Sequence, residues 1–139
     1  MDLDTIEKLN KSSVGTLMES LQIRFTKYTT DCLVAEMPVN KKTIQPYGFL
    51  HGGATMALAE SVGGALSLLS IDSTSFIAVG IEINANHLLP VMAGKVTATA
   101  RFLHKGNSIH VIDIQVTNDL EKLISVCRLT NKILKRDQL

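Results

Sequence analysis

A single carboxylate, Glu60, stands alone in a long uncharged part of the chain. No other residue between Thr43 and Ile71 is formally charged at neutral pH. Residues 54–69 are apolar or small on nearly every side of a helical wheel, which is typical of a buried helix. A carboxylate inside such a helix loses its hydration, so it must be paired, protonated or used in chemistry. Glu60 is therefore the first candidate for a catalytic group.

Four polar or small residues lie just upstream of this carboxylate: Gln45, His51, Gly52 and Gly53. Glycine lets a substrate approach the backbone closely, and N–H groups in a first helical turn have no partner within the helix. A carbonyl oxygen aimed there would meet a hydrogen-bond donor and the positive end of the helix dipole. The residues alone also allow a plainer interpretation, in which the glycines only permit a tight turn and Gln45 is a solvated loop residue.

Size and composition indicate one soluble globular domain. The chain has 139 residues, of which 45% are hydrophobic and 19% charged, enough for a real core. A net charge of +1 with scattered Lys and Arg argues against a nucleic-acid partner. The polar N-terminus does not read as a secretory signal, and the longest apolar run is interrupted, so we expect no membrane span and a cytoplasmic location.

The two cysteines, Cys32 and Cys127, lie far apart and outside any metal-ligand spacing. We expect both to be reduced and buried. A catalytic thiol is disfavoured because neither cysteine sits near a histidine in a plausible loop. We expect no metal site and no bound cofactor.

Periodicity and turn residues predict the order of the elements: two strands, one long apolar helix, then four strands. A helix that is apolar all round needs cover on more than one side, and a strongly curved antiparallel sheet supplies it. In chain order we expect a helix at 4–11 with Asp4 as its N-cap, a turn at 14–20, strands at 21–29 and 31–39, the long helix at 53–70, and strands at 76–88, 95–104, 108–117 and 123–134.

This order, together with the segments QPYGFLHGG, ALAES, GIEINANH and RLTNKIL, resembles the hotdog-fold acyl-CoA thioesterases. The likeness is greatest to the branch containing the 1,4-dihydroxy-2-naphthoyl-CoA, phenylacetyl-CoA and Arthrobacter-type 4-hydroxybenzoyl-CoA thioesterases, and it extends from about Leu17 to Leu134. It implies a single α+β domain over residues 1–139, with a curved antiparallel β-sheet wrapped around one long central helix. It also implies a homodimer with two active sites at the subunit interface, and dimers that commonly pair into a homotetramer.

The same resemblance implies a role for each candidate catalytic residue. Glu60 matches the catalytic carboxylate, as either general base or nucleophile. The Gly52 N–H matches the oxyanion donor, and His51 lines the reacting centre. Gln45 matches a donor that orients substrate or water. In such a dimer, Glu60 of one subunit faces the glutamine and histidine of the other.

Residues for substrate binding follow less directly. Gly53 and Gly64 are expected beside the substrate. The family usually carries Ser or Thr where this chain has Gly64, so a hydroxyl that helps to position water is missing and the pocket is wider. HKGNSIH matches a loop near the CoA nucleotide, although an ordinary hairpin turn explains it as well. The phosphate-binding candidates in that loop are Lys105, Gly106, Asn107 and Ser108.

Some residues near these segments are expected to have a structural role, and for others the role is left open. Asn84, Asn86 and His87 are expected to support the strand and the dimer seam rather than touch the reacting atoms. Four large side chains are candidates to shape the acyl pocket, but they fit the core equally well: Tyr47, Phe49, Met56 and Leu66.

Three functions remain open at this point. The first is an acyl-CoA thioesterase acting on an aromatic or medium-chain acyl group. The second is a non-catalytic acyl-CoA-binding hotdog module, which the missing hydroxyl at Gly64 favours mildly and the retained Glu60 disfavours. The third is a hotdog dehydratase or hydratase. Such an enzyme would need a His–Asp or His–Glu pair in a different arrangement from that of His51 and Glu60.

Overall fold

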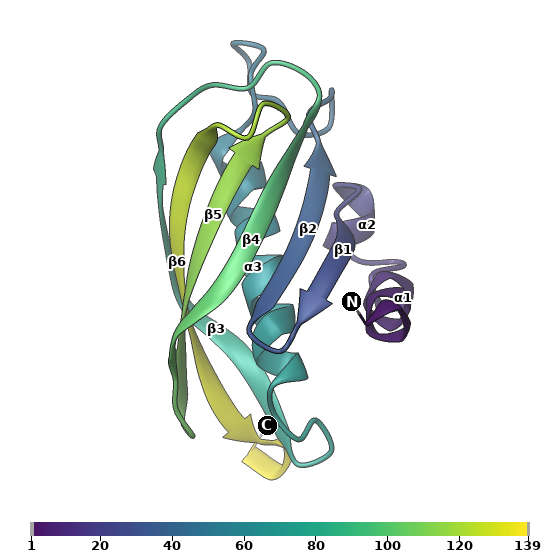
Figure 1. The fold of residues 1–139 in the computed structure, drawn as a ribbon, viewed down its shortest axis with the longest axis vertical. Coiled ribbons are helices and arrows are strands. Elements are labelled where there is room, and N and C mark those ends of the chain that lie inside the picture. The colour runs from purple at the N-terminus through teal and green to yellow at the C-terminus, as the bar shows by residue number, and fades with distance from the viewer. Residues whose placement is uncertain (1, 139) are drawn as a thin grey trace.

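The computed structural model describes residues 2–138, which form one curved antiparallel sheet and a long helix that lies in its concave face (Figure 1). The strand order across the sheet is β1-β2-β4-β5-β6-β3. The predicted sheet wrapped around one central helix is therefore confirmed. The elements are α1 (Leu3–Ser12), α2 (Leu17–Ser20), β1 (Arg24–Thr29), β2 (Cys32–Pro38), α3 (Gly52–Leu69), β3 (Phe76–His87), β4 (Lys95–Lys105), β5 (Ile109–Asn118), β6 (Leu123–Lys135) and the 3-10 turn η1 (Arg136–Gln138).

The core lies between α3 and the concave face of the sheet. Successive side chains of a strand point to opposite faces, so every second residue reaches α3. The close approach of α3 depends on Gly63, because a Cβ built there would lie 2.7 Å from Leu129 Cδ2. The residues that fill this layer and are fully buried include Leu33, Ala35 and Met37 on β2, Ile112, Ile114 and Val116 on β5, and Leu58, Val62 and Leu66 on α3.

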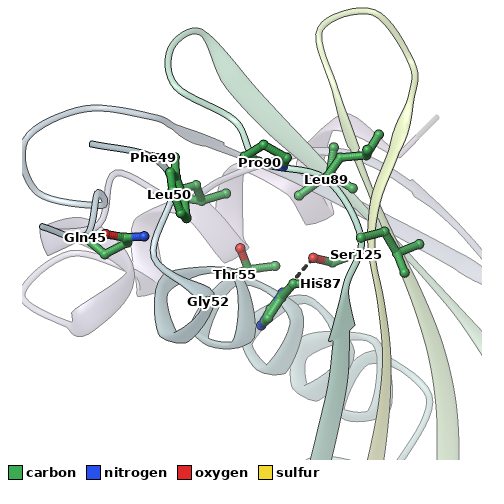
Figure 2. Close-up of a pocket in the computed structure, with 11 residues that line it drawn as sticks. Gln45, Phe49, Leu50, Gly52, Thr55, His87, Leu89, Pro90 and Ser125 are labelled. Atoms are coloured by element: carbon green, nitrogen blue, oxygen red, sulfur yellow. Dashed lines mark hydrogen bonds between the residues drawn. The ribbon is translucent and has the colours of Figure 1, made fainter. Parts of the chain in front are cut away.

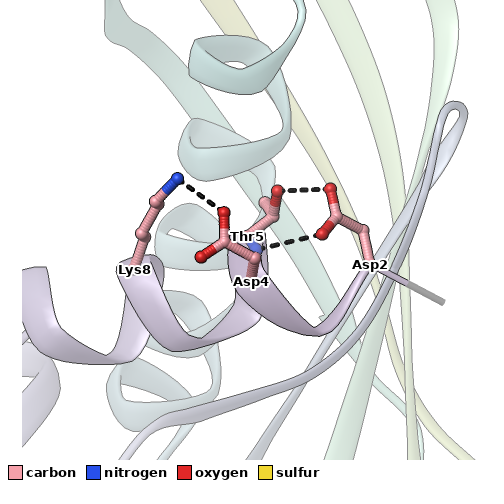
Figure 3. A network of polar contacts seen from close by, with 4 residues as sticks. All are labelled: Asp2, Asp4, Thr5 and Lys8. Atoms are coloured by element: carbon pink, nitrogen blue, oxygen red, sulfur yellow. Dashed lines mark hydrogen bonds and ion pairs between the residues drawn. The ribbon is translucent and has the colours of Figure 1, made fainter.

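The N-cap of the first helix lies two residues earlier than predicted. Asp2 is the N-cap of α1, and its carboxylate accepts hydrogen bonds from the Thr5 N–H at 3.2 Å and the Thr5 hydroxyl at 2.6 Å (Figure 3). The expectation that Asp4 caps this helix was wrong. Asp4 already lies within the first turn, where its exposed carboxylate pairs with Lys8 at 2.6 Å.

The outer edge of β1 is covered by α1. The side-chain amide of Asn10 accepts from the Phe25 N–H at 2.9 Å and donates to the Phe25 carbonyl at 3.0 Å. One side chain thus replaces the pair of hydrogen bonds that a neighbouring strand would make. An edge covered in this way is a poor template for pairing with another chain.

The opposite edge of the sheet, β3, is different. Within residues 2–138 this strand pairs with β6 alone. A bulge between Gly80 and Glu82 shifts its register, and Ile81 is 55% exposed. The bulge therefore interrupts the regular alternation of inward and outward side chains along this strand. No helix in the described part of the chain is long and apolar enough to cross a membrane.

Candidate active site

One face of α3 is not covered by the sheet. The residues that face the sheet are buried, whereas Glu60 and Leu68 are exposed and Gly64, between them, is partly exposed. These three are spaced four residues apart, so they form one stripe along the helix. The expectation that Glu60 loses its hydration inside the helix was wrong for the single chain, since the helix is apolar all round but wrapped on one side only.

Glu60 borders a cavity of about 440 Å³ on this open face. The carboxylate reaches across to β3, where a Cβ built at Gly80 would lie 2.7 Å from Glu60 Oε1. No heavy atom lies within 4 Å of a Cβ built at Gly64, so the missing side chain leaves open space beside the carboxylate. The other walls are mostly apolar and come from α1, α2, β1 and β3; they include Leu9, Met18, Phe25 and Ile77.

The start of α3 presents one free backbone donor. His51 is the N-cap: its Nδ1 accepts from the Gly53 N–H at 2.8 Å, and its carbonyl accepts from Ala54 at 3.0 Å and Thr55 at 3.2 Å. Among the described residues, the Gly52 N–H alone of these four first-turn donors has no partner. An accepting Nδ1 carries no hydrogen, so the neutral His51 ring carries its hydrogen on Nε2.

Gln45 and Gly52 line a second cavity, of about 370 Å³ (Figure 2). The Gln45 Oε1 accepts a short hydrogen bond from the Tyr47 N–H. Its amide nitrogen is therefore the end left to donate. Phe49 also lines this cavity, as one of the large side chains expected near the substrate. A free backbone N–H and an amide donor thus meet at one cavity, which suits the binding of a developing oxyanion.

His87 belongs to the same cavity, and sequence reasoning missed it. Its Nδ1 lies 2.8 Å from the Ser125 hydroxyl, and its Nε2 lies 2.6 Å from a Cβ built at Gly52 (Figure 2). His87 was expected to support the strand and the dimer seam; its contact with Ser125 on β6 fits support of the strand, whereas its place in this cavity was not expected. The end of β3 returns to the start of α3, and that meeting is a property of the fold that local sequence spacing does not reveal.

The loop from Lys105 to Ser108 lies apart from both of these cavities. It turns β4 into β5 and, with Ser70 and Asp72, borders a third cavity of about 350 Å³ at the C-terminal end of α3. The Lys105 ammonium sits 5.5 Å from the centre of the Phe102 ring. Ten residues of helix separate Glu60 from Ser70, a rise of about 15 Å. The structure does not bring this loop into the Glu60 cavity of the same chain.

The candidate catalytic groups are thus divided between two places in one chain. Gln45 and Gly52 line one cavity, with His51 capping the helix beside it, whereas Glu60 borders another. Eight residues of helix between Gly52 and Glu60 correspond to about 12 Å. Of the four large side chains that fitted either the acyl pocket or the core, Leu66 is fully buried in the core.

Both cysteines are free and buried, as predicted. Burial raises the pKa of the Cys127 thiol to about 11, and the charge of Asp113 adds to the rise. The thiolate is the reactive form of cysteine, so Cys127 has little nucleophilic character at neutral pH.

Comparisons with known proteins show that the chain belongs to the thioesterase superfamily. Residues 47–125 match the model of the thioesterase superfamily. The chain is 39% identical over 130 residues to the 1,4-dihydroxy-2-naphthoyl-CoA hydrolase of Escherichia coli, a match that covers 94% of this chain and 95% of that protein.

Solved structures match over most of their length. A thioesterase from Pseudomonas aeruginosa, in a variant with alanine in place of a glutamine, superimposes with a TM-score of 0.92 at 42% identity over 94% of both chains. A Staphylococcus aureus protein with alanine in place of a glutamate superimposes with a TM-score of 0.84 at 44% identity, over 86% of this chain and 98% of that one. A second structure of the latter protein, there called a thioesterase, replaces a glutamine instead.

Proposed function

We propose, because the chain belongs to the thioesterase superfamily, that it hydrolyses an acyl-CoA thioester with an aromatic or medium-chain acyl group to a free acid and CoA. The observation that carries the proposal is the free Gly52 N–H at the start of an 18-residue helix. A donor placed there meets negative charge as it develops on the thioester oxygen, aided by the helix dipole.

Glu60 supplies the second group that the reaction needs. As a general base, it takes a proton from water while the water oxygen bonds to the thioester carbon and the carbonyl electrons move to the oxygen. The carbonyl re-forms as the C–S bond breaks, and the proton passes from Glu60 to the departing CoA sulfur. As a nucleophile, the carboxylate would instead form a mixed anhydride that water then hydrolyses. Both routes give the same products.

Gln45 and His51 orient the substrate in this proposal. The Gln45 amide nitrogen is free to donate because Tyr47 occupies its oxygen. The His51 ring presents Nε2 away from its capping contact with Gly53. Spacing in a relative supports the choice of residues: the glutamine and the glutamate replaced in the two Staphylococcus aureus structures have the same sequence separation as Gln45 and Glu60.

We further propose that the active site is assembled from two copies of the chain. Glu60 and the Gly52 N–H must reach the same carbonyl group, yet they lie about 12 Å apart along α3 and border different cavities. The unpaired edge of β3 offers twelve residues for pairing with a second β3 about a twofold axis. Pairing there would bring Glu60 of one subunit toward Gln45 and His51 of the other.

The CoA nucleotide is assigned to the loop from Lys105 to Ser108. A lysine and exposed backbone N–H groups can hold phosphate oxygens. The expected pairing of dimers into a tetramer and the cytoplasmic location stay predictions; light scattering of the purified protein tests the first, and fractionation of cells tests the second.

The test is release of free thiol from benzoyl-, phenylacetyl-, dihydroxynaphthoyl- and fatty acyl-CoAs, with the wild type and Glu60→Gln side by side. We expect release from at least one substrate and its near loss in the variant, which keeps its fold because, within residues 2–138, the Glu60 side chain makes no hydrogen bond or ion pair. Near wild-type turnover by Glu60→Gln would remove Glu60 from the mechanism.

The same assay addresses the non-catalytic alternative. Gly64 is the observation that favours it, since the hydroxyl usual in the resembling family is missing there. Binding of acyl-CoA without release of thiol from any member of the panel would replace the thioesterase proposal with an acyl-CoA-binding module.

A further inference from the structure

A buried polar chain lies beneath α3, between the helix and the sheet. Its members are His110 on β5, Ser67 on α3 and Asn131 on β6, each no more than 1% exposed. His110 Nδ1 lies 3.1 Å from Ser67 Oγ, and the Asn131 amide nitrogen donates to the same hydroxyl oxygen at 2.7 Å. Such a chain in an otherwise apolar core needs each polar atom to be paired.

One atom of the buried polar chain has no hydrogen-bond partner. Among the residues that the structure describes, Asn131 Oδ1 is the buried side-chain oxygen or nitrogen without a hydrogen-bond partner. Leaving such an acceptor unpaired is unfavourable, because it has lost its water and gained nothing in exchange. An orphaned buried atom of this kind points to a partner that is present at another stage of the protein's work.

The orphaned oxygen lies near the Glu60 carboxylate, since both are close to Gly80. Asn131 and Gly80 are cross-strand partners on β6 and β3, so both point toward α3. A Cβ built at Gly80 would lie 2.7 Å from Glu60 Oε1 and 3.6 Å from Asn131 Oδ1. The two oxygens therefore border the same small space, which Gly80 leaves open.

The orientation of the Asn131 amide follows from its two partners on α3. Its nitrogen lies 3.5 Å from the Gly63 carbonyl, which can only accept a hydrogen bond, and 2.7 Å from Ser67 Oγ. The NH₂ group is therefore the end of the amide that lies at α3. Ser67 Oγ accepts from it and keeps its own hydrogen for His110 Nδ1, which accepts in one tautomer of the neutral ring. The amide oxygen is thus held on the side of Gly80, since a rotated amide would place an acceptor against the Gly63 carbonyl.

We propose that Asn131 is a positioning residue that makes Glu60 a general base rather than a nucleophile. This inference rests on the proposed thioesterase function. An ionised carboxylate has no hydrogen to offer Oδ1. Once Glu60 has taken the proton from the attacking water, its O–H can donate to Asn131 Oδ1. The hydrogen bond forms only in the protonated state, so it stabilises the species that general-base catalysis creates. A nucleophilic carboxylate takes up no proton in its attack and gains nothing from Asn131.

Few titratable groups can influence the pH dependence of kcat/KM through Glu60 and Asn131. Within the described residues of one chain, the side chains that line the Glu60 cavity from α1, α2, β1, α3 and β3 are apolar or hydroxyl-bearing, and none besides Glu60 is titratable. In the proposed dimer His51 of the partner subunit also faces Glu60, so the pH profiles are compared between variants that all keep His51. His110 is the titratable group of the buried chain. Burial lowers the pKa of His110, and the charges of Lys105 and His104 lower it further, against the opposing effect of a backbone hydrogen bond with Gly106. His110 is therefore neutral in the neutral range.

The decisive variant is Asn131→Leu, which keeps the size of the side chain and removes both polar ends. We expect kcat at neutral pH to fall about tenfold, with KM unchanged. We also expect the acid limb of the kcat/KM profile to move to lower pH, because the protonated carboxyl has lost its acceptor. Ile114→Val, a substitution in the same core that does not reach Glu60, is the matched control for loosened packing.

Three outcomes overturn the inference. The first is a wild-type kcat and acid limb in Asn131→Leu, and the second is an equal fall of kcat in Ile114→Val. If Asn131→Leu does not fold, Ser67→Ala is measured instead, because it releases the Asn131 amide from its orientation and should shift the acid limb in the same direction. The third overturning outcome is an acid limb of Ser67→Ala that does not shift. Glu60→Gln is measured in parallel: if it is inactive while Asn131→Leu behaves as wild type, only this inference fails, whereas an active Glu60→Gln defeats the proposed function itself.

Discussion

Gly80 on β3 and Glu60 on α3 fit against each other: a Cβ at position 80 would lie 2.7 Å from Glu60 Oε1. Backbone conformation does not require glycine here, since Gly80 is not among the residues with positive φ. The absent side chain is therefore explained by the carboxylate that occupies its space. A glycine in the middle of a strand normally weakens the strand, so its presence needs such a reason.

Gly80→Ala is expected to separate activity from stability. Alanine restricts the unfolded chain and should leave the free energy of unfolding unchanged or higher by about 0.5 kcal/mol. The Glu60 carboxylate, the end of a flexible side chain, is pushed away, and a displacement of about 1 Å can lower kcat by about a hundredfold. Thermal unfolding and thiol release measure the two effects.

The double variant Gly80→Ala with Glu60→Gln tests whether Gly80 acts through Glu60. Substitutions that act through one shared group are not additive. The double variant should therefore be no less active than Glu60→Gln alone. A further fall in the double variant would mean that position 80 affects the substrate in some other way.

The order of elements and most of the core could be predicted from the sequence, because strand alternation and a long apolar helix are local patterns. His110, Ile112, Ile114 and Val116 alternate along the strand predicted at 108–117, and all four are buried. Local patterns do not reveal which side of an apolar helix the sheet leaves open. For that reason Glu60 was expected to be buried, although it is exposed in the single chain.

The candidate site was predicted in part. Gln45 and Gly52 meet at one cavity because they are close in sequence, and the loop between them is short. The placement of Gly80 and Asn131 beside Glu60 depends on a β-bulge and on pairing between β3 and β6. Residues brought together by register between distant strands carry no common spacing in the sequence, so these neighbours could not be found in it.

His51 has two roles that a pair of substitutions can separate. Its Nδ1 caps α3 through Gly53, and its Nε2 faces outward. His51→Ala removes both and should lower the free energy of unfolding by about 1 kcal/mol. His51→Asn keeps an oxygen that can cap the helix, but its shorter amide NH₂ does not reach the position of Nε2, so it should restore stability without restoring turnover. Recovery of both in His51→Asn, measured by thermal unfolding and thiol release, would reduce His51 to a cap.

The division of the site between two cavities makes a prediction about mixed dimers. Each site is proposed to take Glu60 from one subunit and Gln45 from the other, so homodimers of Glu60→Gln and of Gln45→Ala carry the defect in both sites. A dimer with one subunit of each kind has both defects in one site and none in the other. Such dimers, purified after co-expression with two different tags, should regain about half of the wild-type activity by the twofold symmetry.

The control is each homodimer purified through the same two steps, which must stay near its own low activity. If Glu60 and Gln45 instead served the same site within one chain, every site of the mixed dimer would carry one defect. Activity would then not rise above the average of the two homodimers, and the proposed assembly across β3 would be wrong. Recovery would show that the exposed stripe of α3 is completed by a second copy of the chain, which explains why Glu60 lies uncovered in one copy.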